Sequence, residues 1–253
     1  MNKLFDHEHL RVYEASIGFV AWLEGVVSSI KQSVSARDHI ARASASVPVN
    51  IAEASGTSSM NERRQFIDTA YGSSLECAAC LDVLSILACI STSMAREGKD
   101  RLSAVVSMLI GFRQSTGRLV REEGLSYETG HESANRVFFD HEGLDVYRKA
   151  LDFVRWCEGV RRRGCVVRSA EIAMDKTSTG VALNIAEGNG KFSAKDRCRF
   201  IGHARTAALQ AAATLDVFAA RHADPKVNVL DGKALLADSV RMLVAWQRSI
   251  EGA

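Results

Sequence analysis

The feature that most constrains the fold is an internal repeat with a constant offset. The segment FDHEHLRVYEASIGFVAWLEGVV begins at Phe5, and it returns as FDHEGLDVYRKALDFVRWCEGVR beginning at Phe139, 134 residues later. The same offset aligns the segments that follow, and no gap is needed. A constant offset over this length indicates a duplicated unit of about 115 residues. We therefore predict two tandem copies of one domain, residues 1–123 and 139–253, joined by a linker over residues 124–138.

Periodic apolar residues indicate that the repeated unit is helical. Only two prolines occur among the 253 residues, and apolar residues recur three and four positions apart over long segments. This spacing is typical of amphipathic helices. In the first copy we expect a helix that starts near Leu10, followed by helices over residues 36–54, 60–91 and 100–120. Four such helices with short joints predict the fold class: all-α, with two tandem up-down four-helix bundles.

Two apolar stripes run along the first predicted helix. The main stripe consists of Leu10, Tyr13, Ile17 and Val20. A second strip, spaced by seven, consists of Val12, Phe19 and Val26. An apolar strip left on the outside of a bundle is typical of a contact surface. We expect the second strip to lie outside and to pair with the other copy or with another chain.

The segment Ser46-Val-Pro-Val-Asn-Ile-Ala-Glu53, followed by Phe66, Ala70, Ser73 and Glu76, carries a resemblance to a known family. It resembles the four-helix-bundle proteins encoded in intervening sequences of large-subunit ribosomal RNA genes, which are related to the accessory variability determinant of diversity-generating retroelements. The resemblance covers nearly all of each copy. It implies up-down bundles that associate through their sides into rings, often five-fold. For the retroelement relative it implies a nucleic acid and a reverse transcriptase as partners.

A polar pair, Asn-x-x-Glu, recurs near the end of the second predicted helix. It is formed by Asn50 with Glu53 and by Asn184 with Glu187. Residues three apart are neighbours on one helical face, and a carboxylate there meets the negative end of the helix dipole. We expect this carboxylate to pair with Arg63 in the first copy and with Arg197 in the second. We interpret these six residues as a structural joint between the second and third helices; the alternative is a ligand-binding or catalytic carboxylate, which lacks an acid–base partner.

Residues at equivalent positions in the two copies are expected to end the second helix and to begin the third. Gly56 and Gly190 are expected to close the second helix of each copy in the left-handed conformation. Ser59 and Ser193, each followed three residues later by an acid, are expected to cap the third helix.

Two other motifs contain residue patterns that also occur in metal sites. The repeated Asp-His-Glu is interpreted as a helix start with Asp6 or Asp140 as its cap; the alternative is a metal site assembled between chains. Cys77 and Cys80 lie within a predicted helix and have no second pair at zinc-finger spacing, which favours small buried residues. We predict no metal site, no cofactor and no catalytic residue.

Charge distinguishes the second copy from the first. The formal net charge is only +2. A cluster of arginines surrounds the end of the second copy's first helix: Arg155, Arg161, Arg162, Arg163 and Arg168. Such a cluster could neutralise several phosphates of a nucleic acid. It could equally be a solvated helix end, where cations are favoured.

The sequence leaves two functions open. The first is a non-enzymatic assembly or interaction protein, as a homo-oligomer or an intrachain pseudo-dimer. The alternative is a nucleic-acid-binding accessory protein that uses the arginine cluster, with RNA as the expected ligand. The amino terminus has neither the build of a signal peptide nor a cleavage site, and no long apolar run follows, so we expect a cytoplasmic protein without a membrane partner.

Overall fold

The computed structural model describes residues 3–116, 137–163, 168–221 and 227–252, and every regular element within them is a helix. The predicted all-α class is confirmed. The first half contains the 3₁₀-helix η1 (Asp6–His9) and the helices α1 (Arg11–Ser29), α2 (Ser35–Gly56), α3 (Met60–Ile86) and α4 (Thr92–Ser115). The second half contains η2 (Asp140–Gly143), α5 (Asp145–Arg162), α6 (Arg168–Asn189), α7 (Ala194–Arg221) and α8 (Val229–Glu251). Most of the predicted linker lies outside the described residues.

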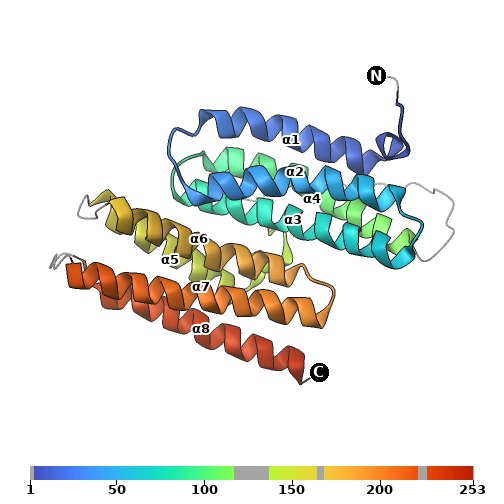
Figure 1. The fold of residues 1–253 in the computed structure, drawn as a ribbon. Helices are drawn as coiled ribbons and strands as arrows, with labels where there is room; N and C mark the ends of the chain where they lie inside the picture. The colour runs from blue at the N-terminus through green and yellow to red at the C-terminus, as the bar shows by residue number, and fades with distance from the viewer. Residues whose placement is uncertain (1–2, 117–136, 164–167, 222–226, 253) are drawn as a thin grey trace.

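The helices of each half pack around one another. In the first half α1 contacts α2 and α4, and α3 contacts the same two helices. In the second half α5 contacts α6 and α8, and α7 contacts the same two helices. The halves then meet side by side, with α3 packed against α6 and α5 (Figure 1). The apolar core continues across this contact, because a single cluster of buried residues includes side chains from both halves.

The core-facing side of α1 differs from the prediction. Val12, Phe19 and Val26 are buried, whereas Ile17 of the predicted main stripe is exposed. The prediction for the second strip was therefore wrong. Both strips have helical spacing, so the periodicity alone could not decide which of them faces α2 and α4.

The boundary between α3 and α4 also differs from the prediction. We predicted helices over residues 60–91 and 100–120, but α3 ends at Ile86 and α4 begins at Thr92. The chain reverses through Ala88, whose φ of 54° lies in the left-handed region. Ser91 then caps α4 by accepting a hydrogen bond from the Met94 amide at 3.1 Å. This cap is a signal in the sequence that the prediction missed.

The ends of α2 and α6 are not closed by left-handed glycines. Gly56 is the last residue of α2, and the Gly190 amide still donates to the Ala186 carbonyl as in a helix. Gly190 is instead required by packing, since a Cβ there would collide with the side chain of Leu75 and lie 3.1 Å from Tyr71 in the other half. Glycine lets the end of α6 approach α3 closely. The predicted caps of the third helices are confirmed, because Ser59 and Ser193 accept from the Glu62 and Asp196 amides.

Candidate functional site: a buried polar cluster between the halves

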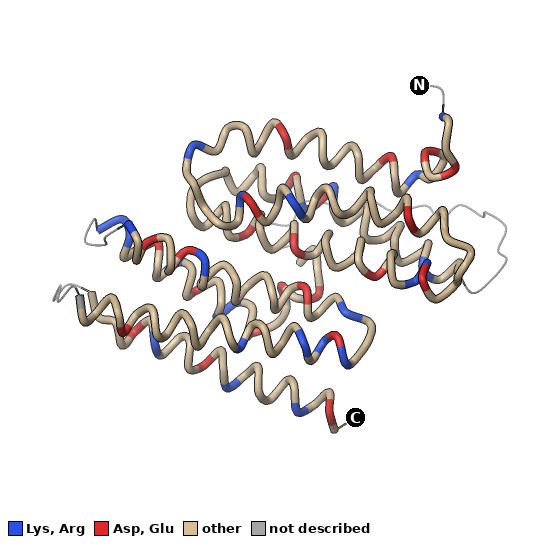
Figure 2. Tube along the Cα trace, viewed as in Figure 1, with Lys and Arg blue, Asp and Glu red and all other residues tan. Residues whose placement is uncertain are grey.

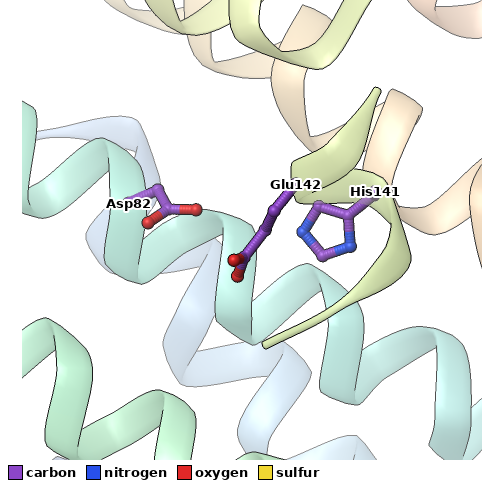
Figure 3. A group of neighbouring side chains, drawn as sticks. All are labelled: Asp82, His141 and Glu142. Atoms are coloured by element: carbon purple, nitrogen blue, oxygen red, sulfur yellow. The ribbon is translucent and has the colours of Figure 1, made fainter. Parts of the chain in front are cut away.

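Five polar side chains from both halves meet where α3 faces η2 and α5. The first half contributes Asp82 from α3 and Lys99 from α4. The second half contributes His141 and Glu142 from η2 and Tyr147 from α5. Figure 3 shows Asp82 and Glu142 pointing toward each other, with the His141 ring beside them. We call these five residues the Lys99 cluster.

Lys99 is the centre of this cluster. Its Nζ forms ion pairs with Asp82 and, at 3.0 Å, with Glu142. The Tyr147 hydroxyl donates a hydrogen bond of 2.9 Å to Asp82 Oδ2. Buried charges are tolerated in proteins when they are paired and hydrogen-bonded. The cluster therefore links the two halves through one cation and two carboxyl groups.

The turn of η2 holds His141 and Glu142 in place. The Glu142 carboxylate accepts the Phe138 amide at 3.0 Å, and the His141 ring lies between Phe139 and Tyr147, with ring centroids 5.8 and 4.7 Å away. The same turn in η1 is closed by Glu8, which accepts the Phe5 amide at 2.8 Å. The prediction that the Asp of Asp-His-Glu caps the first helix was wrong. A 3₁₀ turn brings its third residue, the Glu, back to the unpaired amides at its start.

Burial shifts the protonation of the cluster. Desolvation, with a further contribution from the Lys99 cation, lowers the pKa of His141 to about 3, so its ring is neutral. Desolvation followed by the neighbouring Asp82 raises the pKa of Tyr147 well above its ordinary value. Burial also raises the pKa of Glu142, against the opposing effect of Lys99. Lys99 therefore sits among groups that supply negative charge or none.

The cluster can be tested as a metal site. One ligand atom each from Asp82, His141 and Glu142 lies within 4.8 Å of the others, and neither His141 ring nitrogen has a hydrogen-bond partner among the described residues. However, Lys99 Nζ already lies on the two carboxylates that a metal ion would need. A divalent ion would have to displace it or stand beside a like charge. The donor set fits an internal ion-pair cluster better than a metal centre.

The Asn-x-x-Glu pair does not form the predicted contact with arginine. Asn50 Nδ2 donates to the Ser46 carbonyl at 2.7 Å, and Asn184 Nδ2 donates to the Gly180 carbonyl at 2.7 Å, each one turn back in its own helix. Glu53 is exposed, and within the described residues it forms no ion pair with Arg63, which bonds to the Thr57 carbonyl instead. The predicted pairing of this glutamate with arginine was wrong.

The arginines of the joint bind the backbone instead. Arg63 Nη2 donates to the Thr57 carbonyl at 2.7 Å, and Arg197 Nη2 donates to the Lys191 carbonyl at 2.8 Å. Thr57 and Lys191 lie just after α2 and α6, at equivalent positions of the repeat. Carbonyls at a helix end lack intrahelical partners, so a guanidinium that crosses the turn satisfies them. In both halves, therefore, an arginine bonded to the backbone holds the joint.

The two glutamates should respond differently to neutralisation. Glu187 is partly buried and pairs with Lys191 at 2.9 Å. We expect Glu187→Gln to lower the free energy of unfolding by about 1 kcal/mol, because it leaves Lys191 without its partner. Glu53→Gln, at the equal but exposed position, should change it by less than about 0.5 kcal/mol. Urea unfolding at pH 7 measures both, and equal losses would show that the two glutamates have one role.

The arginine cluster is largely engaged with carboxylates. Arg161 and Arg162 both bond to the buried Glu158 carboxylate, at 2.6 and 2.7 Å, and Arg155 pairs with Asp152 at 2.8 Å. Arg163 is exposed and also has an interaction partner, and Arg168 is exposed at the start of α6. Figure 2 shows acidic and basic positions interspersed along both halves. The positive charge of this cluster is therefore partly cancelled within the protein.

A cavity of about 710 Å³ adjoins these arginines, between the start of α2 and the helices α5 and α6. Its lining carries both signs of charge, including Lys31, Arg168 and Asp175. Across its edge the Ser35 amide donates to Asp175 Oδ2 at 2.7 Å, which ties the two halves together. The cavity thus lies at the junction of the halves.

Cys77 and Cys80, which form the Cys-x-x-Cys motif, are both buried in α3, as predicted for small core residues. Burial raises the pKa of both thiols well above the ordinary value. A metal ligand or nucleophile requires the thiolate, which this environment disfavours.

These features define an all-helical protein whose conspicuous buried polar site is a junction between its own halves. Residues 8–111, which extend from η1 to α4, match the family of 23S rRNA-intervening sequence proteins. This match agrees with the predicted family resemblance over the first half of the chain. Neither the curated proteins nor the solved structures yield a match. No helix in the described part of the chain has the length and apolar character needed to cross a bilayer.

Proposed function

We propose that this chain is a non-enzymatic assembly protein of the ribosomal-RNA intervening-sequence family that acts in the cytoplasm. It is a tandem duplication of a four-helix bundle, and its two copies pair as an intrachain pseudo-dimer. The Lys99 cluster is the observation that supports this proposal. Its ion pairs and its hydrogen bond connect the first half of the chain to the second. Reactive sites keep such groups near a substrate cavity instead.

Packing around the cluster supports the same proposal. The contact between the halves buries Leu75 of α3 and Leu183 of α6 together with the polar groups. An apolar surface with a paired polar centre is the composition of a stable protein interface. The duplicated unit is thus a module that binds another copy of itself through its sides.

The alternative function is RNA binding by the arginine cluster. Exposed Arg163 and Arg168 at one end of the second half favour it, and so does the name of the matching family. The ion pairs of Arg155, Arg161 and Arg162 weigh against it, because these cations are already partly neutralised.

Titration of the full chain with a structured RNA at two salt concentrations separates the two functions. The assembly proposal predicts no saturable binding at either salt. Binding that weakens steeply with salt, and that Arg163→Gln together with Arg168→Gln reduces, would establish the alternative. Arg148→Gln is the matched control, because Arg148 is an exposed cation at the other end of α5.

A further inference from the structure

The cavity at the junction of the halves is lined by residues from both of them. The first half contributes the turn between α1 and α2, the first turns of α2 and the end of α3, and the second half contributes the end of α5 and the start of α6. Its volume of about 710 Å³ lies in the range of pockets that hold small organic ligands, about 300 to 1,000 Å³. Because each half supplies part of the wall, the cavity exists only where the two halves are in contact.

The floor of this cavity, formed by the buried part of its lining, is largely apolar. Four apolar side chains of the lining are at most 8% exposed: Leu87, Val154, Cys157 and Met174. Burial raises the pKa of the Cys157 thiol well above its ordinary value, so this side chain is uncharged as well. Ile172, which is exposed, continues the apolar surface toward the solvent. The floor can therefore cover the apolar part of a ligand.

Three acidic residues of the lining already have partners within the protein. The Glu158 carboxylate bonds to two arginines, at 2.6 and 2.7 Å. Asp175 accepts the Ser35 amide at 2.7 Å, and Glu171 lies 3.7 Å from Arg161. A cationic ligand would have to compete with these contacts. The acids of the cavity wall therefore do not favour a positively charged ligand.

Three basic residues at the mouth of the cavity, the exposed part of its lining, have no such partners. Lys31, Arg168 and Lys176 are all exposed, and none of them forms an ion pair within the part of the chain that the structure describes. Lys31 belongs to the first half, and the other two belong to α6. Asp38 is the exposed acid of the lining, so cations without ion pairs outnumber acids at the mouth. The mouth therefore attracts an anion.

Comparison of the two halves shows that charged residues of this wall are not required by the helical frame. Arg161 of α5 and Asp175 of α6 line the cavity, and the equivalent residues of the first half are Val27 and Ala41. The first half nevertheless forms the corresponding helices α1 and α2. The charges of the wall therefore belong to the cavity at the junction and not to the repeated fold.

We propose that this cavity binds a small amphipathic anion, whose apolar body lies on the buried floor and whose single acidic head group lies at the basic mouth. The body contacts Leu87 of the first half and Met174 of the second, and the head group is attracted by Lys31 and Lys176 across the junction. A ligand that binds both halves stabilises their contact, because it binds only the docked state. This proposal goes beyond the assembly function, since it assigns a ligand to the chain.

Anilinonaphthalene sulfonate is the probe for this site, because it has an aromatic body and one sulfonate and its fluorescence reports contact with apolar surface. Titration of the full chain at pH 7 should show saturable binding of one probe per chain. Decanoate should displace the probe, whereas acetate, which has the same head group without an apolar body, should not. N-phenylnaphthylamine has the aromatic body without the sulfonate and serves as the neutral reference.

Combined substitution of Lys31→Gln and Lys176→Gln tests the basic mouth. Both side chains are exposed, so the fold is retained. The dissociation constant of the sulfonate probe should rise about tenfold, and that of the neutral probe should stay the same. The matched control is Lys3→Gln with Lys195→Gln, which removes one exposed lysine from each half at the far ends of α1 and α6. It should change the binding of the sulfonate probe by less than about twofold, because distant charges are screened by salt.

Several results would overturn this proposal. The wild type might show no saturable binding of the sulfonate probe, or acetate might displace the probe as well as decanoate does. Equal weakening by the two lysine pairs would mean that the probe responds to the net charge of the protein and not to the cavity. Equal weakening of both probes by the Lys31 and Lys176 pair would show that the mouth does not select an anion. None of these results bears on the proposed function, which the RNA titration tests.

Discussion

Replacement of Lys99 by Met should lower the free energy of unfolding by about 3 to 5 kcal/mol, because it leaves two carboxyl groups buried beside each other without their cation. Lys99 is 8% exposed, and it bridges Asp82 in the first half to Glu142 in the second. The loss arises from the two carboxyl groups left behind, which stay largely buried without a counter-ion. Urea unfolding at pH 7 provides the measurement.

The chain contains a matched control for this substitution. Lys233 occupies the equivalent position in α8 and pairs with Asp216 at 2.7 Å, but Asp216 is exposed and Lys233 is only partly buried. Exposed ion pairs contribute about 0 to 1 kcal/mol, so Lys233→Met should have little effect on unfolding. Equal effects of the two substitutions would mean that the Lys99 cluster is not buried between the halves.

Lowering the pH from 6.5 to 5 should destabilise the protein by about 2 kcal/mol through His141 alone. The pKa of His141 is about 3 in the folded chain, against an ordinary value of 6.5. Between these values the unfolded chain binds a proton that the folded chain does not, so stability is present above pH 6.5 and is lost as the pH falls. The groups that face the ring are Lys99, Glu142 and Asp82, and Tyr147 is neutral throughout this range.

Substitution of His141 by Phe should remove this pH dependence. A phenyl ring retains the contacts with Phe139 and Tyr147 and has no nitrogen to protonate. The control is His7→Phe at the equal position of η1, which is more exposed. Glu142, whose pKa is raised by burial, acts in the opposite direction, and it is present in both proteins, so its contribution is common to the two slopes. If the slope between pH 6.5 and 5 is the same in wild type and His141→Phe, His141 is not buried as described.

The helical class, the family resemblance of the first half and the caps of α3 and α7 could be predicted from the sequence because each depends on local sequence. Ser59 and Ser193 cap helices by reaching amides three residues away. The repeat is likewise visible without a structure, since it requires only comparison of the chain with itself. These features do not depend on which surfaces meet.

The sequence could not predict which side of α1 is buried, or that the Lys99 cluster forms. Both depend on which surfaces of the two halves meet. Ile17 and Leu151 occupy equal positions in two similar helices, yet one is exposed and the other buried, because only the second lies under α3. Likewise, Asp-His-Glu is identical in η1 and η2, and only docking of the halves places His141 beside Lys99. Residues at equivalent positions in the two halves therefore differ in burial because only one of each pair lies at the contact between the halves.

The two halves join through one side of α3, and a double-mutant cycle across this contact measures the coupling between them. The Tyr147 hydroxyl and Asp82 Oδ2 come from different halves and lie 2.9 Å apart. Unfolding free energies of Asp82→Asn, Tyr147→Phe and the double variant should give a coupling energy of about 0.5 to 3 kcal/mol. A coupling energy of zero would contradict the packing of the halves described above.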